Sequence, residues 1–186
     1  YRIRGGVPSL VQAASANNLY TTNDLLNGDI LYATISDANL CSDNSAQIVM
    51  VVNPLPSASV DPIDPVCENS NVTISAKPTG MAKYVFHVIS GGITTDYNQN
   101  AVNTLVYTPI DNDKISVTVT SSAGCVSTST EEMVSVTPKP IVNLQLDATT
   151  PSTVVCETDA VIFNASGADR YTFEKIIGGV PTVLQS

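Results

Sequence analysis

The residues with the most distinctive chemistry are four cysteines that recur at matching places in the chain. Cys67 and Cys156 open the segments Cys-Glu-Asn and Cys-Glu-Thr, whereas Cys41 and Cys125 each lie in a short polar turn. Cysteines kept at matching places in a repeat are typical of disulfides formed in an oxidising compartment. One cysteine per loop and a single histidine in the chain do not provide the four ligands of a structural zinc site.

Two pairings of these cysteines are open. The simpler prediction is a Cys67–Cys125 disulfide within one repeat, with Cys41 and Cys156 paired to partners outside the sequence. Such a bond would close a long loop, for which chain entropy gives about 4 kcal/mol of stabilisation. If the strands beside Cys67 and Cys125 run in the same direction, however, the two residues would lie at opposite ends of their domain. A disulfide needs Cα atoms within about 7 Å, so the bonds would then join neighbouring repeats.

The remaining polar groups favour structural roles over catalysis. His87 lies on the polar face of a strand, and the matching residues Arg4 and Glu174 keep none of its chemistry, so we expect a surface residue and no serine–histidine site. Gly91-Gly92 lacks the third glycine, the lysine and the helix of a phosphate-binding loop, which leaves a turn. We therefore expect no catalytic residues, no enzymatic activity and no cofactor.

Several loop carboxylates could hold calcium at repeat junctions, because calcium prefers oxygen ligands. They are Asp61, Asp64, Glu68, Asp111 and Asp113. The corresponding part of the following repeat keeps only Asp147 and Glu157. A solvated acidic rim is therefore the preferred interpretation, and calcium the alternative.

All of these residues belong to a threefold internal repeat, the pattern to seek before any other. The segment Tyr84-Val-Phe-His-Val-Ile-Ser-Gly-Gly-Ile recurs in residues 1–7 and 171–180, and Gly5, Gly91 and Gly178 are 86 and 87 residues apart. Pro-x-Pro segments at 54–56 and 138–140 separate the copies. We therefore expect residues 1–54 to be the C-terminal part of one repeat, 55–138 a complete repeat, and 139–186 the N-terminal part of a third.

Each repeat should be an immunoglobulin-like β-sandwich of about seven strands. Apolar residues alternate with Ser and Thr in residues 71–76, 83–89 and 114–120, which is the period of a half-buried strand. Further strands are expected at 19–21, 104–108 and 126–137. The predicted inward-facing side chains are Val72, Ile74, Tyr84, Phe86, Val106, Ile115, Val117 and Val134.

Composition excludes several partner classes. With 8 Lys and Arg residues and a net charge of −9, the chain lacks the basic patch that nucleic acids require and has no attraction for anionic lipid. No apolar stretch approaches the ~18 residues of a membrane span. Because residue 1 falls inside a repeat, we expect the chain to be a segment of a longer protein.

The repeat resembles a known family. The run Val66-Cys-Glu-Asn-Ser-Asn-Val-Thr-Ile-Ser-Ala, a tyrosine-containing strand, Ile115-Ser-Val-Thr-Val-Thr and then Ala123-Gly-Cys is similar to the PKD-like and Ig-like tandem repeats of large Bacteroidetes cell-surface adhesins. These include gliding-motility adhesins that are exported by type IX secretion. The first copy departs from the pattern, with Leu40 in place of the glycine before Cys41.

The resemblance implies an extracellular segment of a stalk or filament that spaces or supports adhesion, with a possible part in gliding motility. Its partners would be neighbouring repeats, with lateral self-assembly also expected. The alternative is an adhesive module that binds a surface glycan or protein through sandwich loops such as residues 77–82. Those loops carry no aromatic residue, which weakens the glycan version.

Overall fold

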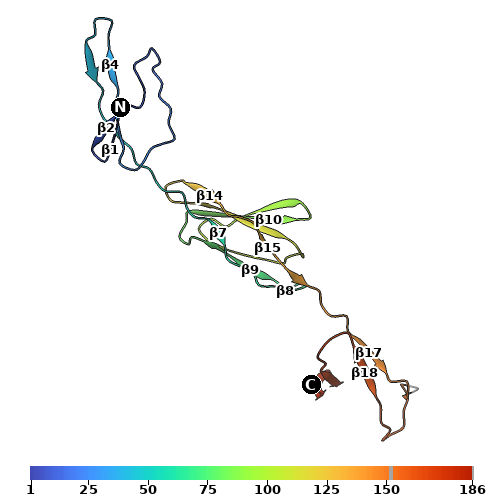
Figure 1. The fold of residues 1–186 in the computed structure, drawn as a ribbon. Coiled ribbons are helices and arrows are strands. Elements are labelled where there is room, and N and C mark those ends of the chain that lie inside the picture. Colours follow the sequence, from blue (N-terminus) through green and yellow to red (C-terminus); the bar gives the residue numbers. More distant parts are fainter. Residues whose placement is uncertain (151–152, 186) are drawn as a thin grey trace.

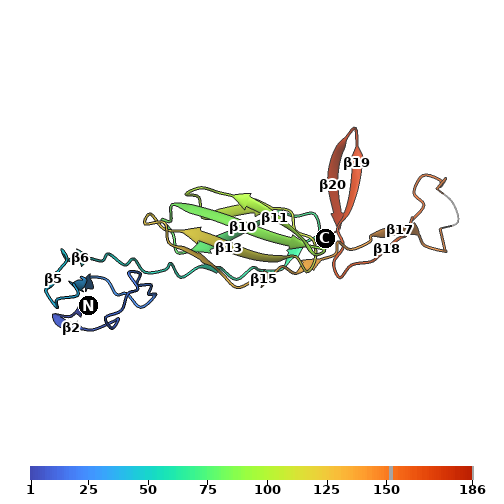
Figure 2. The ribbon, with the colours of Figure 1, turned by 90° about the horizontal axis from the view of Figure 1, so that it is seen from above.

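The computed structural model describes residues 1–150 and 153–185, and these form strands and loops only. Figures 1 and 2 show three units that follow one another along the molecule, with residues 55–138 between the other two. The chain is therefore an all-β protein, as predicted. No helix in the described part of the chain is long and apolar enough to cross a bilayer.

The strands divide among the units as follows. The first unit, residues 1–54, contains β1 (Arg2–Arg4), β2 (Val7–Ser9), β3 (Ile30–Leu31), β4 (Thr34–Ser36), β5 (Ser42–Asn44) and β6 (Ile48–Val49). The complete repeat, residues 55–138, contains β7 (Ser59–Val60), β8 (Val66–Cys67), β9 (Val72–Lys77), β10 (Lys83–Ser90), β11 (Ile93–Asn98), β12 (Thr104–Tyr107), β13 (Lys114–Thr120), β14 (Val126–Thr128), β15 (Glu132–Met133) and β16 (Val136–Thr137). The third unit, from residue 139, contains β17 (Asn143–Leu146), β18 (Phe163–Ser166), β19 (Phe173–Ile177) and β20 (Val180–Gln185).

The complete repeat is a sandwich of two antiparallel sheets. One has the strand order β11-β10-β13-β14, with β15 also paired to β13, and the other has the order β12-β9-β7. Along β10 and β9, buried and more accessible residues alternate, which is the period of two that the sequence shows. A parallel pair, β8 with β16, closes the end from which the chain leaves for the third unit.

The core of this sandwich contains seven of the eight predicted side chains: Val72, Ile74, Tyr84, Phe86, Ile115, Val117 and Val134. Val106 was wrongly predicted, because its side chain is 60% exposed whereas that of Leu105 is 3% exposed. Leu105 lies opposite the buried Ile74, which turns Val106 to solvent. The alternation in this short strand is ambiguous by one residue, and a shift of one residue reverses the two faces.

Tyr84 fixes a loop as well as filling the core. Its ring is fully buried, its hydroxyl donates a hydrogen bond to the carbonyl of Pro78 at 2.7 Å, and it accepts one from the backbone N–H of Met81 at 3.0 Å. In the third unit the hydroxyl of Tyr171 accepts the corresponding bond from Ala168 at 3.0 Å. The tyrosine of the repeated motif thus holds the preceding loop in both copies.

The first and third units each contain only part of this sandwich. In the first unit, β1, β2, β3 and β6 form the counterpart of the β10–β13 sheet, with no second sheet in front of it among the described residues. The predicted strand at residues 19–21 does not form, and the Leu19 side chain is 72% exposed. In the third unit β17–β18 and β19–β20 are two separate hairpins, and Figure 2 shows them standing apart.

Candidate functional site

A hollow in the first unit has a volume of about 820 Å³. The loop of residues 10–20 lines one side of it, and residues 31–36 with Ser42, Ser45 and Ile48 line the other. None of its lining side chains is acidic, basic or a histidine. The hollow therefore offers aromatic, amide and hydroxyl groups but no carboxylate, imidazole or basic side chain.

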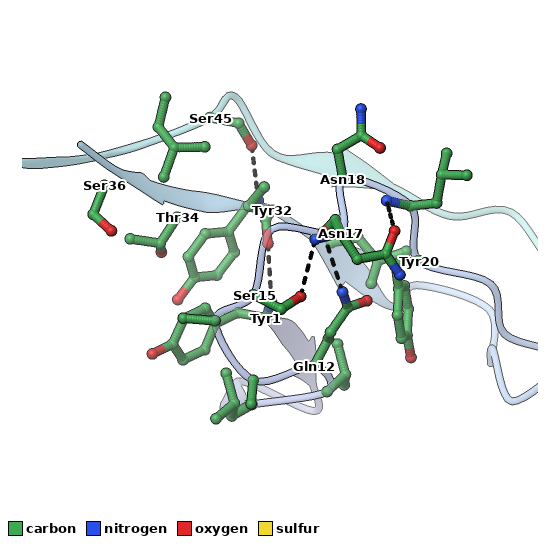
Figure 3. Close-up of a pocket in the computed structure, with 18 of the residues that line it drawn as sticks. Tyr1, Gln12, Ser15, Asn17, Asn18, Tyr20, Tyr32, Thr34, Ser36 and Ser45 are labelled. Carbon is green, nitrogen blue, oxygen red and sulfur yellow. Dashed lines mark hydrogen bonds between the residues drawn. The ribbon is translucent and has the colours of Figure 1, made fainter. Parts of the chain in front are cut away.

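Figure 3 shows the polar groups of this hollow. The rings of Tyr1 and Tyr32 stack with centroids 5.3 Å apart and planes within 8°. The loop is ordered by its own side chains, since Ser15 Oγ accepts from the N–H of Asn17 at 3.2 Å and Asn17 Oδ1 accepts from the N–H of Leu19 at 3.0 Å. The side-chain oxygens of Ser15 and Asn17 are therefore already hydrogen-bonded within the loop.

One wall of the hollow belongs to the sheet that corresponds to β10 and β13 of the complete repeat. The pairing of Ile3 with Ile30 in the first unit corresponds to that of Ile89 with Lys114 in the complete repeat. In this register Leu31, Ala33 and Ile35 correspond to the buried Ile115, Val117 and Val119. Leu31, Ala33 and Ile35 in the lining thus correspond to core positions of the complete repeat, whereas the stacked Tyr1 and Tyr32 correspond to His87 and Ser116 on the opposite face of the sheet.

The same register corrects one sequence alignment. Tyr1, not Arg4, takes the place of His87, because Tyr1 lies beside Tyr32 as His87 lies opposite Ser116. The copies therefore carry Tyr, His and Glu at this place. An alignment of Tyr1 with Tyr84 wrongly places Arg4 opposite His87, because the first copy has three fewer residues before its glycines.

His87 is part of a hydrogen-bonded chain on the outer face of the β10–β13 sheet. Its Nδ1 lies 2.7 Å from Asp96 Oδ1 and its Nε2 lies 2.8 Å from Thr118 Oγ1, which is itself 2.8 Å from Thr128 Oγ1. Sequence inspection missed this group because its members come from β10, β11, β13 and β14. An aspartate, a histidine and a hydroxyl in line have the order of a catalytic triad, but Thr118 also bonds Thr128 across the strands. The arrangement links four neighbouring strands side chain to side chain.

The structure does not bring Cys67 and Cys125 together, and all four cysteines are free thiols. Cys67 lies on β8 opposite Thr137, at the end where β13 begins, whereas Cys125 lies in the hairpin at the other end of β13. The seven residues of β13 separate these ends by about 20 Å, from a rise of about 3.3 Å per residue. That separation exceeds the reach of a disulfide about threefold.

Each of these cysteines instead faces a junction between units. The thiol of Cys125 lies 3.8 Å from the carbonyl oxygen of Asn53, in the linker that enters the repeat. Next to Cys67, the backbone N–H of Glu68 donates to Thr137 at 2.8 Å, and its carboxylate accepts from the N–H of Lys139 in the linker that leaves.

The turns that carry the cysteines keep their backbone geometry between copies. Leu40 and Gly124, each just before a cysteine, have φ of 65° and 82°. Asn69 and Thr158, each two residues after the other cysteine, have φ of 60° and 77°. Left-handed backbone is unfavourable for a branched side chain such as that of Leu40. The hairpin geometry is thus kept even where the sequence lacks the expected glycine.

The loop carboxylates act mainly as local hydrogen-bond acceptors or ion-pair partners. Asp61 pairs with Lys77 at 2.6 Å, and Asp111 accepts from the N–H of Val136 at 2.8 Å. Asp113 is buried and accepts from the N–H of Ile110 at 2.9 Å. In the part of the chain that the structure describes, no three Asp, Glu, His or Cys side chains are grouped as a metal site requires.

The counterpart of Asp113 in the first unit is Asp29, which in addition forms an ion pair with an arginine. Asp29 is 1% exposed and accepts hydrogen bonds from Arg4 at 3.0 and 2.8 Å and from the N–H of Leu26 at 2.9 Å. The bond from Arg4 and the backbone bond from Leu26 lower the pKa of Asp29 to about 2. This carboxylate closes the turn before β3 in the way that Asp113 closes the turn before β13.

Comparison with known proteins gives a distant structural similarity. No known protein family and no curated protein matches the chain. Among solved structures, a 1.5-MDa bacterial ice-binding adhesin, studied for its retention at the host cell surface, is similar at 17% identity and a TM-score of 0.41. The match covers 73% of this chain and about half, 52%, of that one. At this identity and TM-score it carries no argument about the function of this chain.

Proposed function

We propose that this chain is a structural segment of an extracellular, cell-surface adhesin, in which tandem sandwiches form a stalk or filament. The observation that carries the proposal is the arrangement of the three units one after another, with residues 55–138 between the other two (Figure 1). The short Pro-x-Pro linkers favour extended, semi-rigid backbone at both junctions. We assign the chain no catalytic role and no cofactor. A role in gliding motility rests on the family resemblance alone.

Disulfides between repeats would stiffen such a stalk. With Cys67 and Cys125 at opposite ends of the sandwich, the geometry favours bonds between neighbouring repeats over a bond within the repeat. Cys67 would pair with the hairpin cysteine of the following repeat, by exchange with a thiol–disulfide oxidant that is reduced to two thiols. Non-reducing peptide mapping of a chain with two consecutive complete repeats tests this. A Cys67–Cys125 peptide would refute it.

The second candidate function is an adhesive module that binds through its loops. Two hydrogen bonds favour it, because the Tyr84 hydroxyl, donating to Pro78 and accepting from the Met81 N–H, holds the loop at residues 78–81 in one conformation before any ligand arrives. A held loop is also what a stable stalk domain needs, so this observation alone does not make it the first choice.

Competition separates the two candidates. Bacteria that carry the parent protein would be allowed to attach to their surface in the presence of excess soluble chain. A stalk segment leaves attachment unchanged, because it makes no contact with the target. An adhesive module reduces attachment, and that reduction should disappear when residues 78–81 are replaced by glycine and serine.

A further inference from the structure

We propose that Asn27 is a site of spontaneous covalent modification, at which its side-chain amide is converted to aspartate or isoaspartate. The rate is controlled by residues 50–54, the exit segment, which leads from the first unit into the complete repeat. Asn27-Gly28 is the only Asn-Gly pair in the sequence. The inference is independent of the stalk proposal, because it concerns the chemistry of one turn and the hydrogen bonds that hold it.

The modification needs only water as a co-reactant. The backbone nitrogen of Gly28 attacks Cγ of Asn27, and the side-chain nitrogen leaves as ammonia, which carries away the proton of the Gly28 N–H. Water then opens the resulting succinimide ring at Cγ, which gives aspartate, or at the backbone carbonyl carbon, which gives isoaspartate. The net reaction consumes water and releases ammonia, without oxidation or reduction. Glycine favours ring closure because it has no side chain to obstruct its nitrogen.

The turn that carries this pair is open to solvent. Asn27 and Gly28 come just before β3 and are both exposed, so water can reach the ring. Gly28 has left-handed backbone, with φ of 87°, and a Cβ at this residue would meet no atom within 4 Å. A residue that tolerates the left-handed region can therefore replace Gly28 without a clash.

Two hydrogen bonds engage the reacting groups in the folded chain. Asn27 Oδ1 accepts from the N–H of Val52 at 3.1 Å, and the N–H of Gly28 donates to the carbonyl of Met50 at 2.9 Å. The carboxamide must turn toward the Gly28 nitrogen, and that nitrogen must lose its proton, so both bonds have to break before the ring closes. The reaction therefore proceeds from a locally opened state in which the exit segment has left the turn.

This arrangement belongs to the fold of the repeat, because the complete repeat contains both bonds. There the N–H of Asn112 donates to the carbonyl of Val134 at 3.0 Å, and Asp111 Oδ1 accepts from the N–H of Val136 at 2.8 Å. Asp111 takes the place of Asn27 in the repeated sequence. The complete repeat thus shows that an aspartate at this place can hold the segment that leaves the unit.

The two products should therefore act differently on the exit segment. Aspartate keeps an acceptor oxygen on Cγ, so it should hold Val52 as Asp111 holds Val136. Isoaspartate routes the main chain through Cγ and leaves its carboxylate on Cα, which displaces the acceptor from the Val52 N–H. The junction between the first unit and the complete repeat should thus be loosened in the isoaspartate form alone.

Peptide mapping of the full chain, incubated at mildly alkaline pH with and without urea, tests the proposal. Asn27 should be the first asparagine to be modified, with both aspartate and isoaspartate among the products. The reaction should be at least ~10-fold faster in urea, where the exit segment no longer holds the turn. Hydrogen exchange at residues 50–53 should be faster in the isoaspartate fraction than in the unmodified chain, and unchanged in the aspartate fraction.

Two substitutions provide the controls. Gly28→Asn suits the turn, because Asn112 has the same left-handed backbone in the complete repeat, with φ of 66°. Its side chain obstructs ring closure, so modification at residue 27 in urea should fall at least ~10-fold. Asn27→Asp copies Asp111 and should leave exchange at residues 50–53 as in the unmodified chain. Equal rates with and without urea, other asparagines modified before Asn27, or a Gly28→Asn variant as reactive as wild type would each overturn the proposal.

Discussion

The buried hydroxyl of Tyr84 should stabilise the complete repeat through two hydrogen bonds. Tyr84→Phe keeps the buried ring but removes the bonds to the Pro78 carbonyl and the Met81 N–H. At about 1 kcal/mol net for each bond, the loss is about 2 kcal/mol. For a domain of this size it should lower Tm by about 10 °C. Hydrogen exchange of the β10 and β13 amides in the full chain, read by mass spectrometry, reports the change in the unit concerned.

The same chemical change at Tyr107 serves as the control. Among the residues described, the buried hydroxyl of Tyr107 makes no hydrogen bond of good geometry, and burial together with the nearby Asp113 carboxylate raises its pKa. Tyr107→Phe removes a polar group that is buried without compensation, so stability should stay the same or rise slightly. If Tyr107→Phe destabilises the repeat as much as Tyr84→Phe does, with equally accelerated hydrogen exchange, the hydrogen-bond reasoning fails.

Two further predictions concern the first unit. The Asp29 carboxylate should titrate with a midpoint of about 2 by NMR, and because this pKa lies below the unfolded value, its stabilising effect is complete above about pH 4 and is lost as the pH falls through 2. Arg4→Gln should move that midpoint upward, whereas a wild-type midpoint near 3.8 would show that the ion pair does not form. Leu40→Gly should stabilise the Cys41 hairpin by about 1 kcal/mol, because Leu40 has left-handed backbone with φ of 65°. Slower hydrogen exchange at residues 37–41 is expected, and unchanged or faster exchange would contradict it.

The sequence predicted the sheets best where apolar and polar residues alternate over a full strand. β10 and β13 formed as expected, because each has six or more residues whose burial alternates or stays high. β11 was not predicted, since Ile93-Thr-Thr-Asp-Tyr-Asn is mostly exposed at a sheet edge and shows little alternation. The strand expected at residues 19–21 does not form, and among the described residues of the first unit no strand corresponds to β9, with which β12 pairs in the complete repeat.

The polar groups were less predictable, because they depend on how strands lie beside one another. The chain from Asp96 through His87 to Thr118 joins three strands, and nothing in the sequence separates it from scattered polar residues. Cysteine placement was predictable only as a choice between two pairings. Strand direction, which the sequence suggests but does not establish, decides between them.

The most direct test of the stalk account is the shape of the chain in solution. Small-angle scattering would be measured on the full chain over a series of low concentrations and extrapolated to zero, so that contacts between copies do not contribute. With the three units spaced about 40 Å apart, as expected from strand rise, loops and linkers, the radius of gyration should be about 30 Å. A compact globule of the same length would give about 16 Å, and that result would contradict the account.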